Sequence, residues 1–269
     1  MEKQLPIFKI QGTEFLVDVK AQELRERSHP ENVISFLEMN DHGTHYTLEY
    51  DPVGKNLPGM FKHGAMVEIP QMLTLDPEGM AEKYGRKVSE LAGKTDFDLI
   101  VNPEALKLRE NGVLPIIEIA KHPFFVDLRM DSLRPKDDFR TAGIEFSKIE
   151  DYLSEDDFKY IIPYDPKSHQ YVELDYYNIT SVPKGILCVE IPFQSILDPV
   201  GYSRKYGTDL KDTLRAHPPQ AHMIAKIVPW SETPIAQIIE RNLKREQKSP
   251  KATELLKTDK PKKKRGKRL

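Results

Sequence analysis

The sequence predicts an α+β protein: a tandem duplication of a small, mainly antiparallel sheet followed by short helices, plus a C-terminal helix and a disordered basic tail. Short blocks of sequence recur in the same order in both halves of the chain. Each copy begins with β-branched or aromatic runs and later reaches an Asp-Pro step typical of a helix start. We therefore expect one repeat unit at residues 3–110, a second at residues 112–245, and the tail at residues 246–269.

The clearest repeat is the phrase LDPEGMAEKYG at Leu75–Gly85, which returns as LDPVGYSRKYG at Leu197–Gly207 with seven of eleven residues identical. An earlier block, LPIFKI at residues 5–10, returns as LPIIEI 109 residues later. The spacing grows from 109 to 122 residues only across stretches that resemble loops, where insertions are tolerated. This collinear order favours duplication over the alternative, a single domain with recurring short phrases.

Each predicted unit opens with a β-hairpin. Residues 7–10 and 14–19 are strand-like runs on either side of a Gln11-Gly12 turn. The second unit keeps the strands, at residues 116–119 and 124–128, but its turn is expected at Lys121-His122-Pro123. Further strands are expected at residues 33–37, 45–50 and 66–69 in the first unit and at 144–146, 159–164 and 187–191 in the second.

The repeated phrase predicts a helix in each unit. Asp76 fits an N-cap and Pro77 the first helical position, where the missing N–H costs nothing. Gly85 and Gly207 fit the left-handed residue that follows a helix. Other helices are expected at residues 88–91 and 209–214, and an amphipathic one at about 234–245.

Composition points to a cytoplasmic protein. No run approaches the roughly 18 apolar residues that cross a bilayer, and the opening MEKQLPIFKI lacks the pattern of a secretory signal. The single cysteine, Cys188, excludes an internal disulfide and is expected to be a buried thiol. We expect no membrane partner.

Charge is distributed unevenly along the chain. Residues 244–269 hold twelve basic and three acidic residues, whereas the preceding residues carry a net charge of −11. The basic side chains at the end of the tail are Lys260, Lys262, Lys263, Lys264, Arg265, Lys267 and Arg268. Such a stretch predicts salt-sensitive, sequence-independent contact with nucleic acid. The alternatives are contact with the acidic body or with another acidic partner, a solubilising role, and contact with anionic lipid.

Two recurring Asp–Arg pairs form a candidate polar site. Asp18 and Arg25 in the first unit match Asp127 and Arg134 in the second, and they suit either salt bridges or acid–base chemistry.

The segment HGTHY places His42 and His45 where a metal site or an ordinary surface loop is expected, and the aligned DDFKY lacks both imidazoles. No nucleotide, hydrolase or thiol motif is present, so we assign no catalytic residue, metal or cofactor.

These patterns favour a non-catalytic binding or adaptor protein over an enzyme. In that hypothesis, the two units form a pseudo-symmetric pair with a cleft between them for a protein partner, and the tail contacts nucleic acid or an acidic partner. Two alternatives stay open. One is a metal-dependent hydrolase or nuclease-like enzyme with a single active unit, and the other is a structural subunit of a larger assembly.

Overall fold

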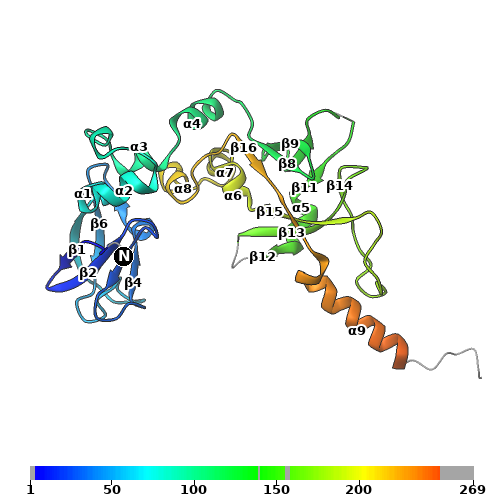
Figure 1. Ribbon diagram of the computed structural model, residues 1–269, viewed down its shortest axis with the longest axis horizontal. Coiled ribbons are helices and arrows are strands. Elements are labelled where there is room, and N and C mark those ends of the chain that lie inside the picture. The colour runs from blue at the N-terminus through cyan, green and yellow to red at the C-terminus, as the bar shows by residue number, and fades with distance from the viewer. Residues whose placement is uncertain (1–3, 139, 155–157, 249–269) are drawn as a thin grey trace, which may run out of the picture.

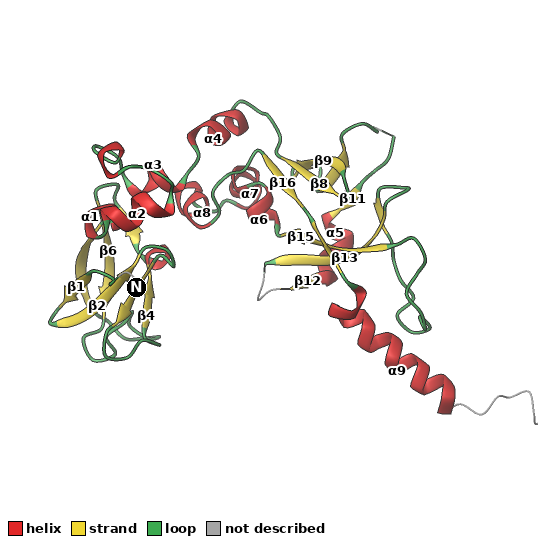
Figure 2. Cartoon of the chain, in the orientation of Figure 1, coloured by secondary structure: helices red, strands yellow, loops and turns green. Residues whose placement is uncertain are grey.

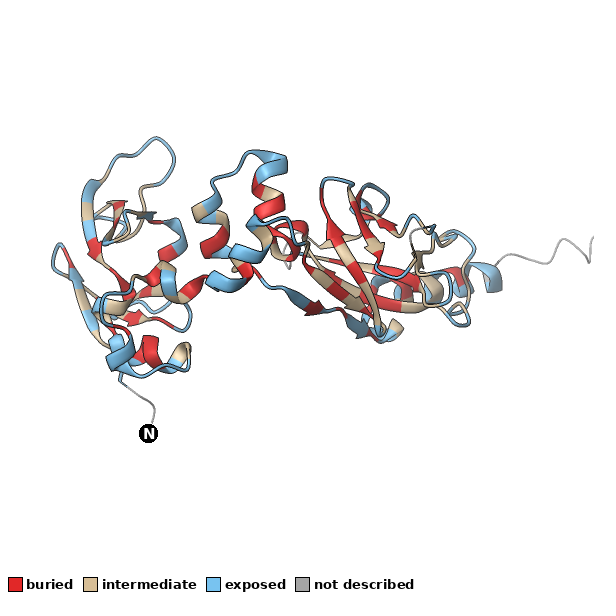
Figure 3. Ribbon diagram, turned by 90° about the horizontal axis from the view of Figure 1, so that it is seen from above, coloured by how far each residue is buried: buried red, intermediate tan, exposed pale blue. Residues whose placement is uncertain are grey.

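The computed structural model describes residues 4–138, 140–154 and 158–248, and it confirms the α+β class. Two sheet-bearing halves lie at opposite ends of the molecule, with helices between them (Figures 1 and 2). We refer to residues 4–110 as the first half and to residues 112–248 as the second half. Buried residues lie inside both halves and along the helices that join them (Figure 3).

The first half contains two antiparallel sheets. Ile7 pairs with Leu16 across the opening hairpin, and the predicted turn is confirmed, since Gln11 and Gly12 have φ values of 46° and 88°. One sheet consists of β1 (Ile7–Ile10), β2 (Thr13–Asp18), β3 (Glu23–Glu26) and β4 (Val33–Ser35). The other consists of β5 (Asn40–Asp41), β6 (His45–Tyr50) and β7 (Ala65–Pro70).

The helices of the first half follow the second sheet. The predicted Asp-Pro start is confirmed, because the Asp76 carboxylate accepts a 2.8 Å hydrogen bond from the Gly79 amide and Pro77 is the first helical residue. The α-helices are α1 (Met72–Leu75), α2 (Pro77–Lys83), α3 (Asp96–Ile100) and α4 (Pro103–Glu110). Two short 3₁₀ helices are η1 (Phe36–Glu38) and η2 (Val88–Glu90).

The second half opens with the same hairpin, and Ile116 pairs with Phe125 in the register of the first half. The predicted turn was wrong: it falls on Ala120 and Lys121, with φ values of 50° and 69°, and His122 already begins a strand. Proline is locked near φ −65° and cannot take the left-handed conformation that a two-residue hairpin requires. The strands of this sheet are β8 (Ile116–Ile119), β9 (His122–Asp127), β10 (Ser132–Pro135), β11 (Ile144–Glu145) and β16 (His222–Ile224).

Residues 222–228 tie the two sheets of the second half together. β16 pairs in parallel with β8, and the next strand, β17 (Lys226–Val228), pairs with β15 (Leu187–Pro192). The other strands of the second sheet are β12 (Leu153–Ser154), β13 (Lys159–Asp165) and β14 (Gln170–Tyr171). The helices are α5 (Phe146–Ile149), η3 (Glu150–Tyr152), α6 (Gln194–Leu197), α7 (Pro199–Tyr206), α8 (Leu210–Ala216), η4 (Trp230–Glu232) and α9 (Pro234–Lys248).

Both halves share an order of elements: a four-stranded meander, a second sheet, a one-turn helix and a helix that starts with Asp-Pro. Asp198 caps α7 by accepting from the Gly201 amide, as Asp76 caps α2, and Gly207 is left-handed with φ 71°. Descent of the halves from one duplicated unit, and the domain bounds, remain predictions. The predicted C-terminal helix is confirmed as α9, whereas the segment predicted as a tail lies almost entirely outside the described residues.

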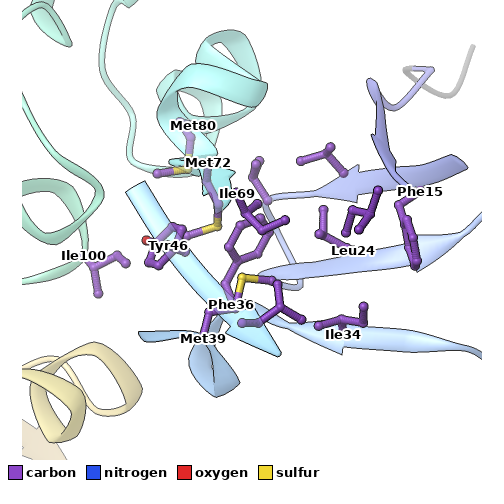
Figure 4. Close-up of a cluster of buried hydrophobic side chains, with 14 of the residues drawn as sticks. Phe15, Leu24, Ile34, Phe36, Met39, Tyr46, Ile69, Met72, Met80 and Ile100 are labelled. Carbon is purple, nitrogen blue, oxygen red and sulfur yellow. The ribbon is translucent and has the colours of Figure 1, made fainter. Parts of the chain in front are cut away.

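Each half has its own apolar core. In the first half, Phe15, Leu24 and Ile34 of the meander pack with Tyr46 and Ile69 of the second sheet (Figure 4). Two residues of the second half, Val200 of α7 and Leu214 of α8, belong to this same cluster. The core of the first half therefore continues into the helices of the second.

A buried guanidinium fastens this junction. Arg215 of α8, only 2% exposed, donates from Nη1 to the Met39 carbonyl at 3.2 Å and from Nη2 to the Phe36 carbonyl at 2.5 Å. Its guanidinium carbon lies 5.0 Å from the ring centroid of Tyr46, and the Asp41 carboxylate is 3.7 Å from its Nε. These contacts are strong because little water competes for the charge.

We expect Arg215→Met to lower the free energy of unfolding by about 3 kcal/mol, because two carbonyl oxygens lose their buried donor and Asp41 loses a neighbouring cation. Urea denaturation followed by circular dichroism measures the change. Arg241→Met, on an exposed position of α9, is the control and should stay within about 0.5 kcal/mol of the parent. Equal effects of the two changes would show that the junction does not depend on Arg215.

The middle glycine of the repeated phrase is predicted to be intolerant of a side chain. A Cβ atom at Gly79 or Gly201 would lie 2.0 or 2.1 Å from the carboxylate oxygen of the capping aspartate. We expect Gly201→Ala to lower the free energy of unfolding by about 1–3 kcal/mol in thermal or urea denaturation. Gly59→Ala is the matched control, since nothing lies within 4 Å of its Cβ position. A Gly201→Ala variant as stable as this control would contradict the clash.

Candidate anion-binding site

The predicted polar residues form two separate ion pairs. Asp18 lies 3.6 Å from Arg25, and its carboxylate also accepts from the amides of Lys20 and Ala21 at 3.0 Å, which closes the β2–β3 turn. The two pairs lie in different halves, so they do not converge on one cleft (Figure 1). They therefore do not supply the paired carboxylates of an acid–base site.

The second pair, Asp127 with Arg134, is more deeply buried, and fewer carboxylates compete for its arginine. The Asp127 carboxylate, 4% exposed, accepts from Arg134 Nη2 at 2.8 Å and from its Nε at 3.1 Å. Arg25 shares its guanidinium with Glu23 as well as Asp18, but Ser132 stands at the matching position of the second half. Arg134 is thus held by a single carboxylate.

Asp127 and Arg134 line a cavity of about 540 Å³ between the end of α4, the β9–β10 hairpin and α7. The lining is dominated by cations, which we call the cation cluster: Arg109, Arg129, Arg134, Arg204 and Lys205. Sequence analysis identified only one of these five residues.

Three members of the cation cluster are held by carboxylates. Arg109 Nε lies 2.9 and 3.0 Å from the two oxygens of the fully buried Asp198, which at the same time caps α7. Lys205 Nζ contacts Asp131 at 2.7 Å. With the Arg134–Asp127 pair, these contacts fix the walls of the cavity.

Arg129 and Arg204 make no ion pair or side-chain hydrogen bond with any residue of the described segments, and both are exposed. The site thus combines five cations with the carboxylates of Asp127, Asp131 and Asp198, a net charge of +2. Two unpaired guanidinium groups beside a cavity are suited to binding an anion.

The matching surface of the first half has no excess of positive charge. Lys20, in the place of Arg129, pairs with Glu82 at 2.7 Å, and Glu82 stands in the place of Arg204. Here three cations (Lys20, Arg25 and Lys83) face three carboxylates (Asp18, Glu23 and Glu82). The net charge near α7 in the second half therefore differs from that near the matching helix α2 in the first half.

The lysine of the repeated phrase differs in environment between the halves. Lys83 donates to the carbonyls of Val19 and Lys20 at 2.7 and 3.2 Å, and burial lowers its pKa. Burial acts against the charge of Lys205 too, but the Asp131 carboxylate and the Tyr206 hydroxyl outweigh it and raise the pKa of this lysine. Lys205 consequently holds its proton more firmly than an ordinary lysine.

His42 and His45 are brought together but without further metal ligands. Their rings stack with centroids 4.9 Å apart, and their nitrogens contact the hydroxyls of Thr47 and Thr44 at 2.9 and 3.0 Å. Within residues 4–138, 140–154 and 158–248, no group of three or more His, Cys, Asp or Glu side chains is arranged to hold a metal ion.

Glu26 is a buried carboxylate that sequence analysis did not identify. Its side chain, 2% exposed, contacts Asn32 at 3.0 Å, Lys55 at 2.6 Å and the neighbouring Ser28 and His29, and these partners hold its pKa well below its usual range. Ser28 and Glu26 both contact the same Nδ1 atom of His29. The imidazole therefore cannot relay a proton between them as in a hydrolase triad.

Asp96 is buried for a structural reason. Its carboxylate accepts from the Tyr46 hydroxyl and the Met72 amide at 2.7 Å and from the Leu73 amide at 2.9 Å, which joins α3 to the start of α1. Burial raises the pKa of Asp96, and the three donors act in the opposite direction.

Cys188 is buried as predicted, and burial raises its pKa to about 11, so the thiol stays protonated at neutral pH.

Two other cavities lie in or beside the second half. One, of about 880 Å³, lies beside α9 and contains the hydroxyls of Tyr152, Tyr171 and Tyr176, which bond mainly to one another at 2.9 and 2.5 Å. The other, of about 330 Å³, lies at the junction between Leu37 of the first half and Tyr202 of the second. The first of these cavities is also lined by the carboxylates of Asp151 and Glu173, and neither cavity gathers several cations as the cation cluster does.

Comparison with protein-family models, curated proteins and solved structures found no match to this chain. In the described part of the chain, none of the helices has the length and apolar character needed to span a bilayer.

A pair of stacked histidines lies in the second half, away from the cation cluster. The rings of His122 and His169 are 3.6 Å apart at their centroids and nearly parallel, and His122 Nε2 is buried with no hydrogen-bond partner among the described residues. Burial and the neighbouring His169 lower the pKa of His122, against the opposing effect of Asp137 and Asp138. Burial also lowers the pKa of His217.

These lowered pKa values predict that acid destabilises the fold. Histidine binds protons more readily in the unfolded chain, where its pKa is about 6.5, so the contribution of these histidines to stability is full above that pH and is lost as the pH falls below it. The free energy of unfolding, measured by urea denaturation across this range, should fall less steeply in His122→Phe than in the parent. His63→Gln, 94% exposed at the side chain, is the control. An unchanged pH dependence in His122→Phe would contradict the prediction.

Proposed function

We propose that this chain is a non-catalytic binding protein that contacts the phosphate groups of nucleic acid through the cation cluster of its second half. The observation that carries this proposal is the net charge of +2 around one cavity, where Arg129 and Arg204 have no ion-pair partner among the described residues. Guanidinium groups present forked donors that match phosphate oxygens, so arginine is the residue best suited to this role.

The chemistry of the cavity favours contact with the backbone over recognition of bases. Its apolar lining comes from Leu114 and Leu128, and none of the described residues that line it is aromatic. Base recognition on single strands depends largely on stacking against aromatic rings. Binding is thus independent of sequence and sensitive to salt.

The predicted basic tail supplies a second contact in this proposal. Its seven cations between Lys260 and Arg268 would act together with the cation cluster on one strand, and two linked contacts raise the overall affinity. The rest of the chain, with its net negative charge, limits non-specific contact elsewhere.

An adaptor role in the cytoplasm completes the proposal. The single cysteine suits a reducing compartment, and the cavity at the junction, which has both aromatic and polar lining, offers a place for a protein partner. Binding is favoured over hydrolysis because Asp18, Asp127, Glu26 and Asp96 are all engaged by structural donors.

The proposal predicts that removal of two cations weakens the salt dependence of binding. We expect the double variant Arg129→Gln and Arg204→Gln to bind a fluorescein-labelled single-stranded oligonucleotide more weakly in an anisotropy titration. The slope of log affinity against log salt should become shallower by about 1 to 2 units, because fewer counterions are released.

Two comparisons locate the effect. The variant Lys226→Gln with Arg241→Gln removes two exposed cations elsewhere in the second half and should keep the parent slope. A full-length variant with glutamine at all seven tail cations measures how much the tail contributes to the affinity and to the salt slope. An unchanged slope in the cation-cluster variant, together with unchanged affinity, would disprove the role of the cation cluster.

A further inference from the structure

We infer that the cation cluster recognises a terminal phosphate monoester of a nucleic-acid strand in preference to the phosphodiesters within it. This inference rests on the proposed function and specifies its ligand. It follows from the charge, the volume and the lining of the cavity, and from the contrast with the first half.

The charge of the site matches a monoester. Five cations and three carboxylates leave a net charge of +2. A phosphate monoester carries about −1.5 to −2 at pH 7, because its second pKa is near 6. A phosphodiester carries a single negative charge, so it would leave one of the two unpaired guanidinium groups without a counter-charge.

The five cations line one cavity and come from three different elements of the fold. Arg109 approaches from the end of α4, Arg129 and Arg134 from the β9–β10 hairpin, and Arg204 and Lys205 from α7. An internal phosphodiester offers two non-bridging oxygens and has chain on both sides, whereas a terminal monoester offers three and has chain on one side only, so cations that come from three elements can contact more of its oxygens. The volume of about 540 Å³ lies within the range of about 300–1,000 Å³ for small-molecule sites, which admits a terminal nucleotide.

The base of the cavity is pre-organised. The Arg109 side chain is 13% exposed and held by the buried Asp198, and Arg134 is held by Asp127. Arg129 and Arg204 are exposed and carry no competing partner within the described residues. The fixed pairs thus shape the cavity, and the unpaired groups supply the donors to the phosphate.

The first half has the same order of strands and helices but lacks this cation cluster. Glu82 occupies the position of Arg204 on the matching helix and pairs with Lys20, which occupies the position of Arg129. Arg204→Glu therefore introduces the side chain that the matching helix of the first half already carries at this position. It serves as a test that removes the charge of the site with little risk to the fold.

The experiment compares three internally labelled single-stranded oligonucleotides of one sequence: one with a 5′-phosphate, one with a 3′-phosphate and one with hydroxyls at both ends. We expect the full-length protein to bind one phosphorylated form about tenfold more tightly than the unphosphorylated strand, as charge-assisted hydrogen bonds imply. Arg204→Glu should abolish this preference, and Arg129→Glu should do the same independently. Glu82→Arg, the reciprocal change in the first half, should preserve it.

The outcomes separate this inference from the proposed function. Equal affinity for all three strands, with the salt slope still dependent on the cation cluster, would overturn recognition of strand ends and leave backbone contact intact. Absence of salt-dependent binding to any strand would overturn both. Adenosine monophosphate binding as tightly as the phosphorylated strand would replace a nucleic-acid end by a free nucleotide and would overturn the inference.

Discussion

The buried guanidinium of Arg215 is the contact on which the arrangement of the two halves depends. Its hydrogen bonds to the Phe36 and Met39 carbonyls place α8 against the first half, and its position over Tyr46 connects it to Asp96, which that tyrosine hydroxyl contacts. The two carbonyls satisfy Nη1 and Nη2, whereas the buried Nε has no hydrogen-bond partner among the described residues and is only near the Asp41 carboxylate. The junction therefore depends on hydrogen bonds from α8 to two backbone carbonyls of the first half.

The cation cluster inherits its geometry from this junction. α7 lies between α8 and the Arg109–Asp198 pair, so contacts at both ends fix the orientation from which Arg204 and Lys205 project. Asp198 caps α7 through the Gly201 amide and also binds Arg109, so one carboxylate sets both the start of the helix and the wall of the cavity. A side chain at Gly201 would disturb both at once.

The sequence predicted those features that depend on neighbouring residues. The hairpin at Gln11-Gly12 and the cap at Asp76 follow from backbone conformation and short-range hydrogen bonds, and the structure has both. Strands β16 and β17 were missed because three-residue strands carry no periodic pattern and exist only through partners far along the chain. The docking of α8 was missed for the same reason, since Arg215 contacts residues more than 170 positions away.

Sequence analysis identified only part of the site because it relied on residues that recur in both halves. Asp127 and Arg134 were identified because they recur, yet the charge without a partner among the described residues comes from Arg129 and Arg204, the latter at the position where the first copy has Glu82. The charge reversal is one of four differences between the two copies of the repeated phrase, and it is a signal that the sequence contained. An exposed helix position changes sign with little effect on stability, while the local charge shifts by two units. Two halves with a common backbone frame can thus differ in ligand without any change in their cores.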